Sequence, residues 1–336
     1  MKKRLLALGL VLVFAFTLVG LAACGEKEAE RPEVPRIAFV PKVVGQAWWD
    51  YVRDEGVAAW ARETGIDVIY QGPPEVSVEG QVQIITDLLA QGIDILHCAP
   101  NDPSAVEALF AEARSNGVIV ITHEAEGIRN VDFNLEAFDS KGMGGFLMDE
   151  LAGMMGGEGE YVTMVGSMTM QSHNDWADAA VARQKEAYPN MVLVPTARVS
   201  SESDSEVAYA RTMELMQLYP NLKGILGTGS FDGPGAGRAI RDAGRTGEVF
   251  AISLGIPSEL RDLLHEGVLQ AGGLWNPALS AKAMLNLGMM LWNGETIQTG
   301  SDLGIPGYDN IIVNGTEIIG DGAIAITKDN VDDFTF

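Results

Sequence analysis

Short apolar runs alternate along the chain with longer stretches in which apolar residues recur at helical spacing, beginning near residue 36. Runs of this length and composition predict β-strands. The first of them lie at 37–40, 68–70, 93–96 and 118–121. Between these runs, the apolar positions from Val82 to Leu89, followed by Gly92, are typical of a helix and its end. Strands that alternate with helices predict right-handed βαβ units and a parallel sheet.

The same alternation starts again after a break at 124–130. Further apolar runs predict strands at 161–165, 191–194, 224–226, 249–252 and 269–274. Stretches with helical spacing lie at 174–187, 205–218, 258–264 and 278–292. Near the end of the chain, the pair Asn314-Gly315 predicts a hairpin turn between strands at 311–313 and 317–319. The pattern therefore predicts two successive α/β lobes.

The chain begins with a segment of a different kind. A basic head at 2–4 precedes an uncharged apolar run, Leu5–Ala23, which ends in small residues before Cys24. This order is typical of an export signal, and it resembles the signal of bacterial lipoproteins, whose cysteine is acylated. We therefore expect removal of residues 1–23, a lipid anchor on Cys24 that holds the exported protein on a bacterial membrane, and a flexible tether at 24–35. The alternative is a single membrane-spanning anchor.

Composition and charge narrow the classes of function. The chain has 336 residues, of which 47% are hydrophobic, enough for about two domains with buried cores. Asp and Glu number 46 against 23 Lys and Arg, for a formal net charge of −23. An excess of negative charge this large repels a phosphate backbone, so we expect no nucleic-acid partner. The two cysteines, Cys24 and Cys98, cannot supply a disulfide framework.

Three segments resemble the first lobe of ribose-type periplasmic solute-binding proteins. They are RIAFVPKVVGQAWWD (36–50), GPPEVSVEGQVQIITDLLAQGIDIL (72–96) and GVIVITHEAE (117–126). They are most similar to the branch that contains the autoinducer-2 and rhamnose receptors. The resemblance implies the type I periplasmic-binding fold, in which two Rossmann-like α/β lobes with parallel sheets are joined by a three-strand hinge. It also implies a ligand held in the cleft between the lobes and delivered to the permease of an ABC importer.

This resemblance also leads to expectations about the domains and the assembly. We expect an N-terminal lobe made of 36–124 plus 276–300, and a C-terminal lobe made of 125–275 plus 301–336. The body of the protein is expected to be a monomer. It is expected to be a binding protein rather than an enzyme, and to need no cofactor.

The candidate ligand-binding residues follow strands of the two lobes or lie at the expected crossing between them. In open parallel sheets, ligands bind outside the carboxyl ends of the strands, where loops and helix N-termini present unpaired backbone groups. The candidates are Lys42, Trp48, Trp49, Glu124, His173, Asn174, Thr228, Ser230, Asp232, Ser253, Trp275 and Asn276. Among them, Lys42 matches a lysine that contacts the ligand in the autoinducer-2 receptors. The tryptophan pair matches the paired aromatic residues of ribose-type receptors.

These residue types indicate a small neutral sugar or polyol as the ligand. The tryptophans would form an apolar wall, Glu124 would accept hydroxyl protons, and Lys42 would donate. Ser172-His173 and Leu254 depart from the residues that receptors for autoinducer-2 and ribose carry at these places. Phosphorylated sugars are not expected, because Lys42 alone does not offset the desolvation of a phosphate. A neutral pentose, deoxyhexose or short polyol remains.

Two other functions stay open on the sequence. The first is a receptor that presents its ligand to a membrane sensor, as in autoinducer-2-like signalling, and that uses the same closed form. The second is a hydrolase, because Ala251-Ile252-Ser253-Leu254-Gly255 resembles a nucleophile elbow with Ser253 as the nucleophile. No metal site is expected, since the histidines show no zinc-binding spacing. Gly142-Met143-Gly144-Gly145 is a poor dinucleotide fingerprint, and helix packing explains it more economically.

Overall fold

The computed structural model describes residues 32–334 of the chain. The predicted signal peptide at 1–23, the predicted lipidation residue Cys24 and most of the predicted tether at 24–35 lie outside these described residues. Among the residues that are described, no helix combines the length and the apolar character needed to cross a membrane.

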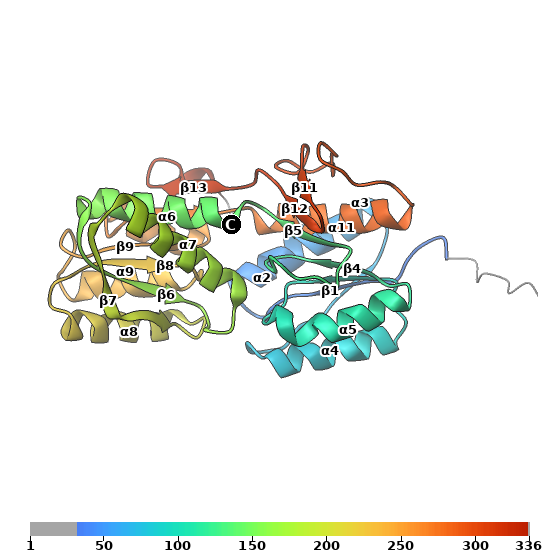
Figure 1. Ribbon diagram of the computed structural model, residues 1–336, viewed down its shortest axis with the longest axis horizontal. Helices are drawn as coiled ribbons and strands as arrows, with labels where there is room; N and C mark the ends of the chain where they lie inside the picture. Colours follow the sequence, from blue (N-terminus) through green and yellow to red (C-terminus); the bar gives the residue numbers. More distant parts are fainter. Residues whose placement is uncertain (1–31, 335–336) are drawn as a thin grey trace, which may run out of the picture. The chain divides into compact units, whose positions relative to one another are not determined.

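Two sheets form the framework of residues 32–334 (Figure 1). Within this range the first sheet has seven strands, in the order β11 (Ile312–Asn314), β12 (Glu317–Ile319), β5 (Phe133–Glu136), β4 (Ile119–Thr122), β3 (Ile95–Cys98), β1 (Ile37–Val40) and β2 (Val68–Tyr70). The second has six described strands, in the order β13 (Ile324–Thr327), β10 (Leu269–Leu274), β9 (Phe250–Leu254), β8 (Leu222–Gly227), β6 (Glu158–Val165) and β7 (Asn190–Ser200). The pairs β11–β12 and β10–β13 are antiparallel, and the other neighbouring strands are parallel. The α/β fold class predicted from the alternation of strands and helices is confirmed.

Helices cover the faces of both sheets. Those of the first lobe are α2 (Ala47–Tyr51), the π-helical turn η1 (Val52–Val57), α3 (Ala58–Thr64), α4 (Val78–Ala90), α5 (Pro103–Ser115) and α11 (Pro277–Trp292). Those of the second lobe are α6 (Ser140–Met155), α7 (Gln171–Ala187), α8 (Ser205–Leu218), α9 (Asp232–Asp242), α10 (Pro257–His265) and the short 3-10 turn η2 (Val331–Asp333). In the first lobe, α4 and α5 pack on one face of the sheet and α11 packs on the other.

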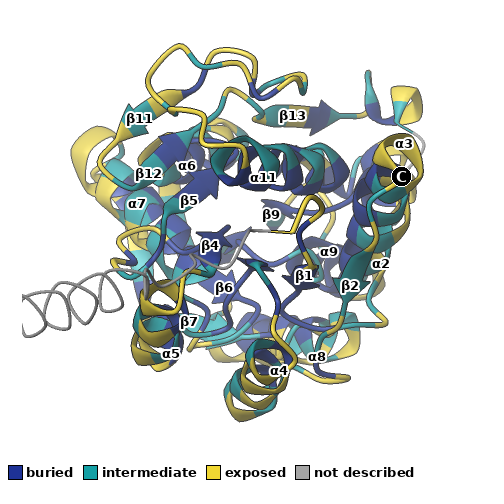
Figure 2. Cartoon of the chain, turned by 90° about the vertical axis from the view of Figure 1, so that its right-hand side faces the viewer, coloured by how far each residue is buried: buried dark blue, intermediate teal, exposed yellow. Residues whose placement is uncertain are grey.

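The central strands are buried on both sides, which explains why they read as continuous apolar runs. Every residue of β1 is buried: Ile37 and Phe39 belong to the core on one face, and Ala38 and Val40 to the core on the other. Figure 2 shows these strands in the colour of buried residues, with exposed residues on the outer sides of helices such as α4 and α8. The sheets therefore form a rigid base from which loops extend at the carboxyl ends of the strands.

The chain crosses between the two lobes at 137–139, 275–276 and 320–323, so three segments of its described part form the hinge. The lobe boundaries differ from those that the sequence predicted. Because β5 pairs with β4 and β12 pairs with β5, residues 125–136 and 312–319 belong to the N-terminal lobe. The break at 124–130 is a loop within that lobe, after which the chain returns to the same sheet.

Strand β5 was missed because polar residues interrupt its apolar pattern. Asn134 and Glu136 alternate with Phe133 and Leu135, and both polar side chains are buried, at 0% and 7% exposure. Such buried polar groups need partners supplied by the fold, which no local pattern reveals. The edge strand β13 was not predicted either. The predicted hairpin is confirmed, with β11 and β12 paired across a turn in which Gly315 has a φ of 65°.

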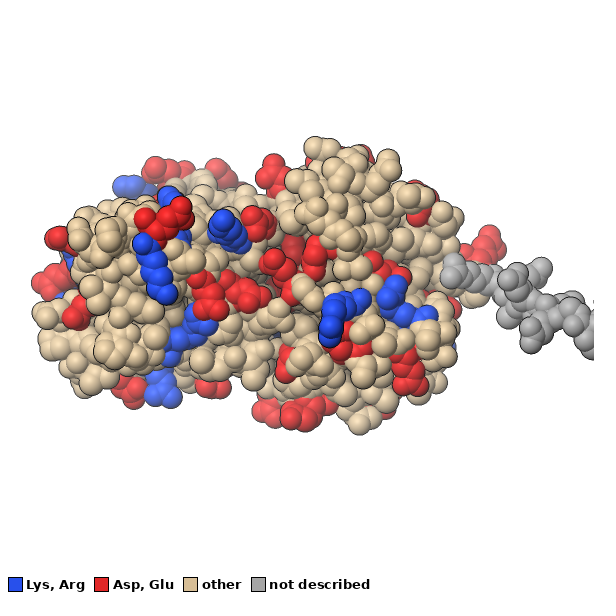
Figure 3. Space-filling view, viewed as in Figure 1, with Lys and Arg blue, Asp and Glu red and all other residues tan. Residues whose placement is uncertain are grey.

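Acidic side chains lie on both lobes and near their junction on the face seen in Figure 3. They outnumber the basic side chains there, in keeping with the formal net charge of −23. A negative surface of this kind disfavours the approach of anions to the junction between the lobes.

Candidate functional site

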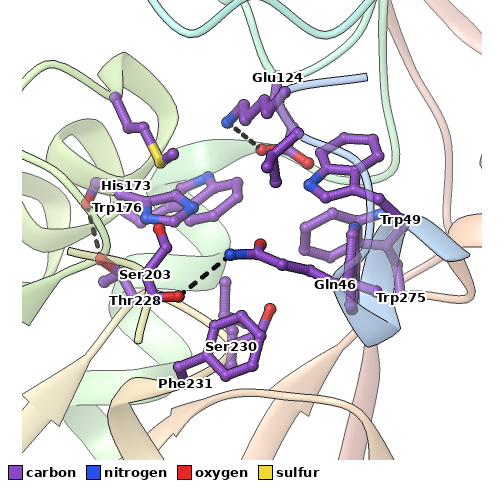
Figure 4. Close-up of a pocket in the computed structure, with 15 residues that line it drawn as sticks. Gln46, Trp49, Glu124, His173, Trp176, Ser203, Thr228, Ser230, Phe231 and Trp275 are labelled. Atoms are coloured by element: carbon purple, nitrogen blue, oxygen red, sulfur yellow. Dashed lines mark hydrogen bonds and ion pairs between the residues drawn. The ribbon is translucent and has the colours of Figure 1, made fainter. Parts of the chain in front are cut away.

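A pocket lies between the two lobes and borders the crossing segment at 275–276 (Figure 4). It encloses about 480 Å³ of space between atoms, part of it open to solvent. The lining residues are Lys42, Val43, Gln46, Trp48, Trp49, Glu124, Met170, His173, Trp176, Ser203, Thr228, Ser230, Phe231, Leu254 and Trp275. Both lobes and the crossing segment therefore contribute to one site.

Lys42, Glu124 and Ser172 form a buried polar network that joins the lobes. Lys42 follows β1 and Glu124 follows β4, whereas Ser172 lies in the first turn of α7 in the second lobe. Lys42 Nζ donates to Glu124 Oε2 at 2.6 Å and to Ser172 Oγ at 2.9 Å. The Ser172 hydroxyl donates to the same carboxylate oxygen at 3.1 Å. Since the Lys42 and Glu124 side chains are only 3% and 4% exposed, the two charges are removed from water as a pair.

The charge of Glu124 is maintained by its partner. Burial is the largest single effect and raises the pKa of Glu124, but the charge and the hydrogen bond of Lys42, together with the nearby His123 and His173, outweigh it and hold that pKa well below its ordinary value. The carboxylate is therefore ionised at neutral pH, and the pair carries no net charge. The backbone at Glu124 has a φ of 55°, in the left-handed region that residues other than glycine rarely adopt.

The histidines next to this pair are neutral. Burial, assisted by the charge of Lys42, lowers the pKa of His173 to about 3. Its Nδ1 accepts a hydrogen bond from the Gly166 N–H at 3.1 Å, so its proton lies on Nε2. Burial also lowers the pKa of His123, whose Nδ1 donates to the carbonyl oxygen of Leu135 at 2.6 Å. The ionisable side chains that line the pocket therefore sum to zero charge near pH 7.

Trp275 is the centre of an aromatic cluster that connects both lobes and the hinge. Its ring centroid lies 4.7 Å from that of Trp48 in the first lobe and 5.7 Å from that of Trp176 in the second. Phe138, in another crossing segment, lies 5.2 Å away. His173 stacks on Trp176 at 5.6 Å. The edge-to-face contacts of Trp275 with the other three indole and phenyl rings fix the ring positions. Among the described residues, the buried Trp275 Nε1 has no hydrogen-bond partner.

Two further hydrogen bonds join the lobes around the pocket. Gln46 Nε2 donates to the carbonyl oxygen of Ser203 at 3.2 Å, and Gln171 Nε2 donates to that of Glu126 at 2.7 Å. Both bonds link a loop of the first lobe to the second lobe. Together with the contact of Ser172 to the buried ion pair, they hold the molecule in a closed arrangement around the pocket.

The structure brings most of the sequence-predicted site residues into the lining of this pocket. These are Lys42, Trp48, Trp49, Glu124, His173, Thr228, Ser230 and Trp275. They come from segments that follow β1, β4, β6 and β8, and from the crossing after β10. This is the edge of the sheets at which ligands of open parallel sheets bind.

Asn174, Asp232 and Asn276 were also predicted as ligand-binding residues, but they stand behind the lining. Asn174 Nδ2 donates to the carbonyl oxygen of Met170 at 2.8 Å, which holds the loop before α7. Asp232 Oδ2 accepts from the backbone N–H groups of residues 228 and 229 at 3.0 and 2.7 Å. Asn276 Oδ1 caps α11 by accepting two backbone N–H groups. Each of these side chains is used to position a segment that borders the pocket.

Ser253 lacks the surroundings of a nucleophile. It lies inside β9, is 1% exposed, and its Oγ donates to the carbonyl oxygen of Leu254 at 2.6 Å. A nucleophile elbow instead places its serine on an exposed turn between a strand and a helix. Ser253 also does not line the pocket, so its prediction as a site residue and the hydrolase alternative both lose their structural basis. Across residues 32–334, no group of three or more His, Cys, Asp and Glu side chains is placed to hold a metal ion.

Sequence reasoning missed part of the lining. The residues not selected are Val43, Gln46, Met170, Trp176, Ser203, Phe231 and Leu254. Gln46 lies between the selected lysine and the tryptophan pair, so its place in the segment 36–50 was a usable signal. Ser203 contributes through a turn after β7, and nothing in its local pattern indicates that this turn reaches the other lobe.

The fold and the pocket define a hinged, two-lobed protein with a site for a small molecule between its lobes. A family profile described as "Periplasmic binding protein domain" matches residues 37–296. The chain belongs to this family of periplasmic binding proteins. It is therefore a binding protein and not an enzyme, and the predicted type I periplasmic-binding fold is confirmed.

Individual relatives are distant but match over nearly the whole chain. The D-ribose/D-allose-binding protein of Pseudomonas aeruginosa is 24% identical over 308 residues, which cover 88% of this chain and 92% of that protein. The xylitol-binding protein of Mycolicibacterium smegmatis is 23% identical over 319 residues, which cover 94% of this chain and 83% of that protein.

Solved structures give the same result for the fold. LsrB from Clostridium saccharobutylicum, in complex with AI-2, superposes with a TM-score of 0.80 at 19% identity, covering 90% of this chain and 100% of that one. An ABC transporter solute-binding protein from Clostridium phytofermentas with bound L-rhamnose gives a TM-score of 0.81 at 21% identity, covering 90% and 98%. At such identities the likeness establishes the fold alone.

Proposed function

We propose that this protein is the solute-binding component of an ABC importer and that it binds a small neutral sugar or polyol in the pocket between its lobes. The family supports the general role. Relatives that are named for binding ribose, allose and xylitol support the class of ligand. The particular sugar or polyol is proposed to be a pentose, a deoxyhexose or a short polyol.

The observation that carries this proposal is a pocket with aromatic walls and no net charge. Trp48, Trp49 and Trp275 provide flat apolar surfaces. Lys42 and Glu124 neutralise each other. A sugar or polyol combines apolar C–H faces with hydroxyl groups that both donate and accept hydrogen bonds. It therefore matches a lining of indole rings interspersed with a few polar groups.

The unpaired groups of the pocket support the same ligand class. A buried N–H without a partner costs free energy, and Trp275 Nε1 is such a group among the described residues. A ligand hydroxyl can accept from this indole and from the Nε2–H of His173. The Glu124 carboxylate can accept from a second hydroxyl. The binding of a polyhydroxy compound would thus remove an existing cost and add hydrogen bonds to charged groups.

Charged ligands match this lining less well. A phosphorylated sugar requires cations to offset its desolvation, but Lys42 is already paired with Glu124 at 2.6 Å. The formal net charge of −23 also opposes the entry of an anion. An amino acid carries a charge at each end. Its site would therefore need two protein side chains of opposite charge that are held apart.

We further propose that the protein is exported and anchored to a bacterial membrane through Cys24 after residues 1–23 are removed. The support is the order of basic head, apolar run and small residues before that cysteine. The intact mass of the protein extracted from membranes should match an acylated chain that begins at Cys24. A Cys24→Ala variant that is still processed and still membrane-bound would contradict the anchor.

A thermal-shift screen of neutral sugars and polyols tests the ligand class. The panel contains D-ribose, D-allose, D-arabinose, L-rhamnose and xylitol, with ribose 5-phosphate and glycine as charged comparisons. A ligand at a hundred times its dissociation constant adds about 2.7 kcal/mol of stability, so a binder raises the melting temperature measurably. Uptake of the binding sugar by cells with and without the protein then separates import from signalling.

Matched variants test whether the rise in melting temperature arises from binding in the pocket. Trp48→Ala and Glu124→Ala should each abolish the shift, because one removes an apolar wall and the other a buried acceptor. Glu112→Ala, at an exposed position of α5, should leave it intact. If only the charged compounds raise the melting temperature, or if both pocket variants respond like the parent, the proposed site is wrong.

A further inference from the structure

The side chain of Gln46 extends from the first lobe across the pocket toward the second (Figure 4). Its Nε2 donates to the carbonyl oxygen of Ser203 at 3.2 Å, although the two residues are 157 positions apart in sequence. Both residues line the pocket and both are partly exposed. This contact therefore lies closer to solvent than the buried network around Lys42.

The local structure does not otherwise use the Gln46 side chain. Gln46 occupies the N-cap position of α2, where Ser, Thr, Asp or Asn usually accepts a backbone N–H of the first turn. Its side chain makes no capping hydrogen bond. Gly45, with a φ of 78°, turns the chain just before it. The side-chain amide of Gln46 is thus not used to cap its own helix, and it is directed to the other lobe.

The acceptor is presented by a turn whose backbone is held in place. Glu202 and Ser203 have φ values of 54° and 53°, in the left-handed region that is costly for residues other than glycine. The Ser203 N–H donates to the carbonyl oxygen of Gly166 at 2.8 Å, and the Glu202 N–H donates to Ser200 Oγ at 3.1 Å. These bonds fix the direction in which the Ser203 carbonyl points.

This turn also packs directly against the pocket. A Cβ at Gly166 would lie 2.8 Å from Ser203 Oγ and 2.9 Å from His173 Cε1, so glycine is needed for the turn and the histidine to approach each other. Ser203 and His173, which both line the pocket, therefore pack next to the same glycine. A fixed acceptor on one lobe and an uncommitted donor on the other form a contact that exists only when the lobes are closed.

We propose that Gln46 is a latch: a positioning residue that bonds to the Ser203 carbonyl in the closed form and so slows opening of the lobes and release of the solute. An interaction made in only one of two conformations shifts the equilibrium toward that conformation. The latch acts on the site assigned under the proposed function and rests on it for the release of solute. Its effect on opening of the empty protein can be measured without any ligand.

The first test measures opening of the ligand-free protein. Spin labels are placed at Thr86→Cys on α4 and Gln217→Cys on α8, two exposed positions on helices away from β12 and β13 (Figure 1). Distances between the labels are recorded for the parent, Gln46→Ala and Gln46→Glu. Loss of one neutral hydrogen bond should lower the ratio of closed to open molecules by about two- to tenfold in Gln46→Ala. Gln46→Glu should lower it further, because a carboxylate then faces a carbonyl oxygen.

The control is Gln83→Ala, which removes an exposed glutamine whose amide bonds to Asp87 on the same helix. It should leave the closed fraction unchanged. Circular dichroism of every variant checks that the fold is retained.

The second test measures release by stopped-flow tryptophan fluorescence, with each member of the neutral sugar and polyol panel that binds the parent. Gln46→Ala should raise the dissociation rate by about two- to tenfold and leave the association rate nearly unchanged. A residue that only supports the fold would not separate the two rates in this way.

The outcomes separate the latch from the proposed ligand class. Equal closed fractions in the parent and Gln46→Ala, together with equal release rates for every sugar that binds, overturn the latch and leave the ligand class standing. A lower closed fraction in Gln46→Ala supports the latch even if no neutral sugar binds, in which case the proposed ligand class fails instead.

Discussion

Glu124 keeps its charge inside the protein because the Lys42 ammonium lies 2.6 Å from its carboxylate. Taking each charge out of water is costly, and the mutual attraction repays that cost only when the hydrogen bonds are well formed. Ser172 completes these bonds from the other lobe. The contact of this pair with Ser172 is therefore a feature of the closed molecule, and the pair sets the charge that a ligand meets in the pocket.

Removing one member of this pair should be more harmful than removing both. Lys42→Met should lower the free energy of unfolding by about 3–5 kcal/mol, because Glu124 is left buried without its partner. The double variant Lys42→Met/Glu124→Leu carries no buried charge and should recover much of that loss. Urea unfolding at pH 7, followed by circular dichroism, measures both free energies. A double variant no more stable than Lys42→Met would argue against a tightly coupled pair.

Glu136 provides a prediction about pH. Burial, together with the nearby charge of Glu124, raises the pKa of Glu136 from 4.5 to about 8, although bonds from Asn134 and the Ala125 N–H oppose the shift. The native state therefore holds a proton here that the unfolded chain has lost. Its contribution to stability is complete below the unfolded pKa and is lost as pH rises through the folded value, at up to about 1.4 kcal/mol per pH unit.

Glu136→Gln replaces the protonated acid by a neutral group of similar shape. Near pH 5 the variant and the parent should be similarly stable, and by pH 8 the variant should be the more stable of the two. Chemical unfolding across this range gives the difference at each pH. A constant difference from pH 5 to pH 8 would show that Glu136 titrates normally in the folded protein.

At the scale of elements, helix α6 approaches α7 closely enough to require glycine. A Cβ at Gly144 would lie 2.5 Å from the carbonyl oxygen of Trp176 and 2.8 Å from the Ala180 backbone nitrogen. One position further along α6, a Cβ at Gly145 would meet nothing within 4 Å. Helix packing, and not a nucleotide-binding loop, thus accounts for Gly144. Because α7 carries His173 and Trp176, the contact also sets one wall of the pocket.

These adjacent glycines form a matched pair for mutation. Gly144→Ala should destabilise the protein by about 1–3 kcal/mol, because the added methyl group meets backbone atoms that cannot easily move. Gly145→Ala should stabilise it by about 0.5–1 kcal/mol, since alanine is the better helix former. Thermal and urea unfolding of the two variants provide the comparison. Equal effects at the two positions would mean that the close contact of α6 with α7 does not form in solution.

At the scale of the whole molecule, each lobe supplies only part of the binding surface. Lys42, Glu124 and the tryptophan pair come from the first lobe, whereas His173, Thr228 and Ser230 come from the second. A solute that contacts both sets binds the closed form better than the open form, so it shifts the population toward closure. Trp275 occupies one of the crossing segments and lines the pocket, which places the hinge next to the bound solute.

Small-angle scattering should therefore show a smaller radius of gyration when a binding sugar from the panel is added at saturation. The forward scattering should correspond to a monomer with and without the sugar. Glu124→Ala, which is expected not to bind, should show no change in radius. An unchanged radius for the parent at saturating sugar would remove the hinge from the mechanism.

The sequence by itself determined the alternation of strands and helices, the presence of two lobes and the loops that hold the candidate site. These properties follow from local periodicity. A strand such as β1, which is buried on both faces, must be apolar throughout, and the chain between β11 and β12 must turn at Asn314-Gly315. Lys42 and Glu124 could be predicted as site residues for the same reason, because each follows a recognisable strand.

Only the tertiary structure decided which segments meet. The assignment of 125–136 to the N-terminal lobe depends on the pairing of β5 with β4. The assignment of 312–319 depends on the pairing of β12 with β5, which joins residues nearly two hundred positions apart through backbone hydrogen bonds that any strand can make. The bond from Gln46 to Ser203 likewise depends on how the two lobes close. Local sequence specifies the period of an element and the chemistry of its side chains. The partner of a backbone group or an amide is chosen by the packing of the whole chain, since many partners are locally equivalent.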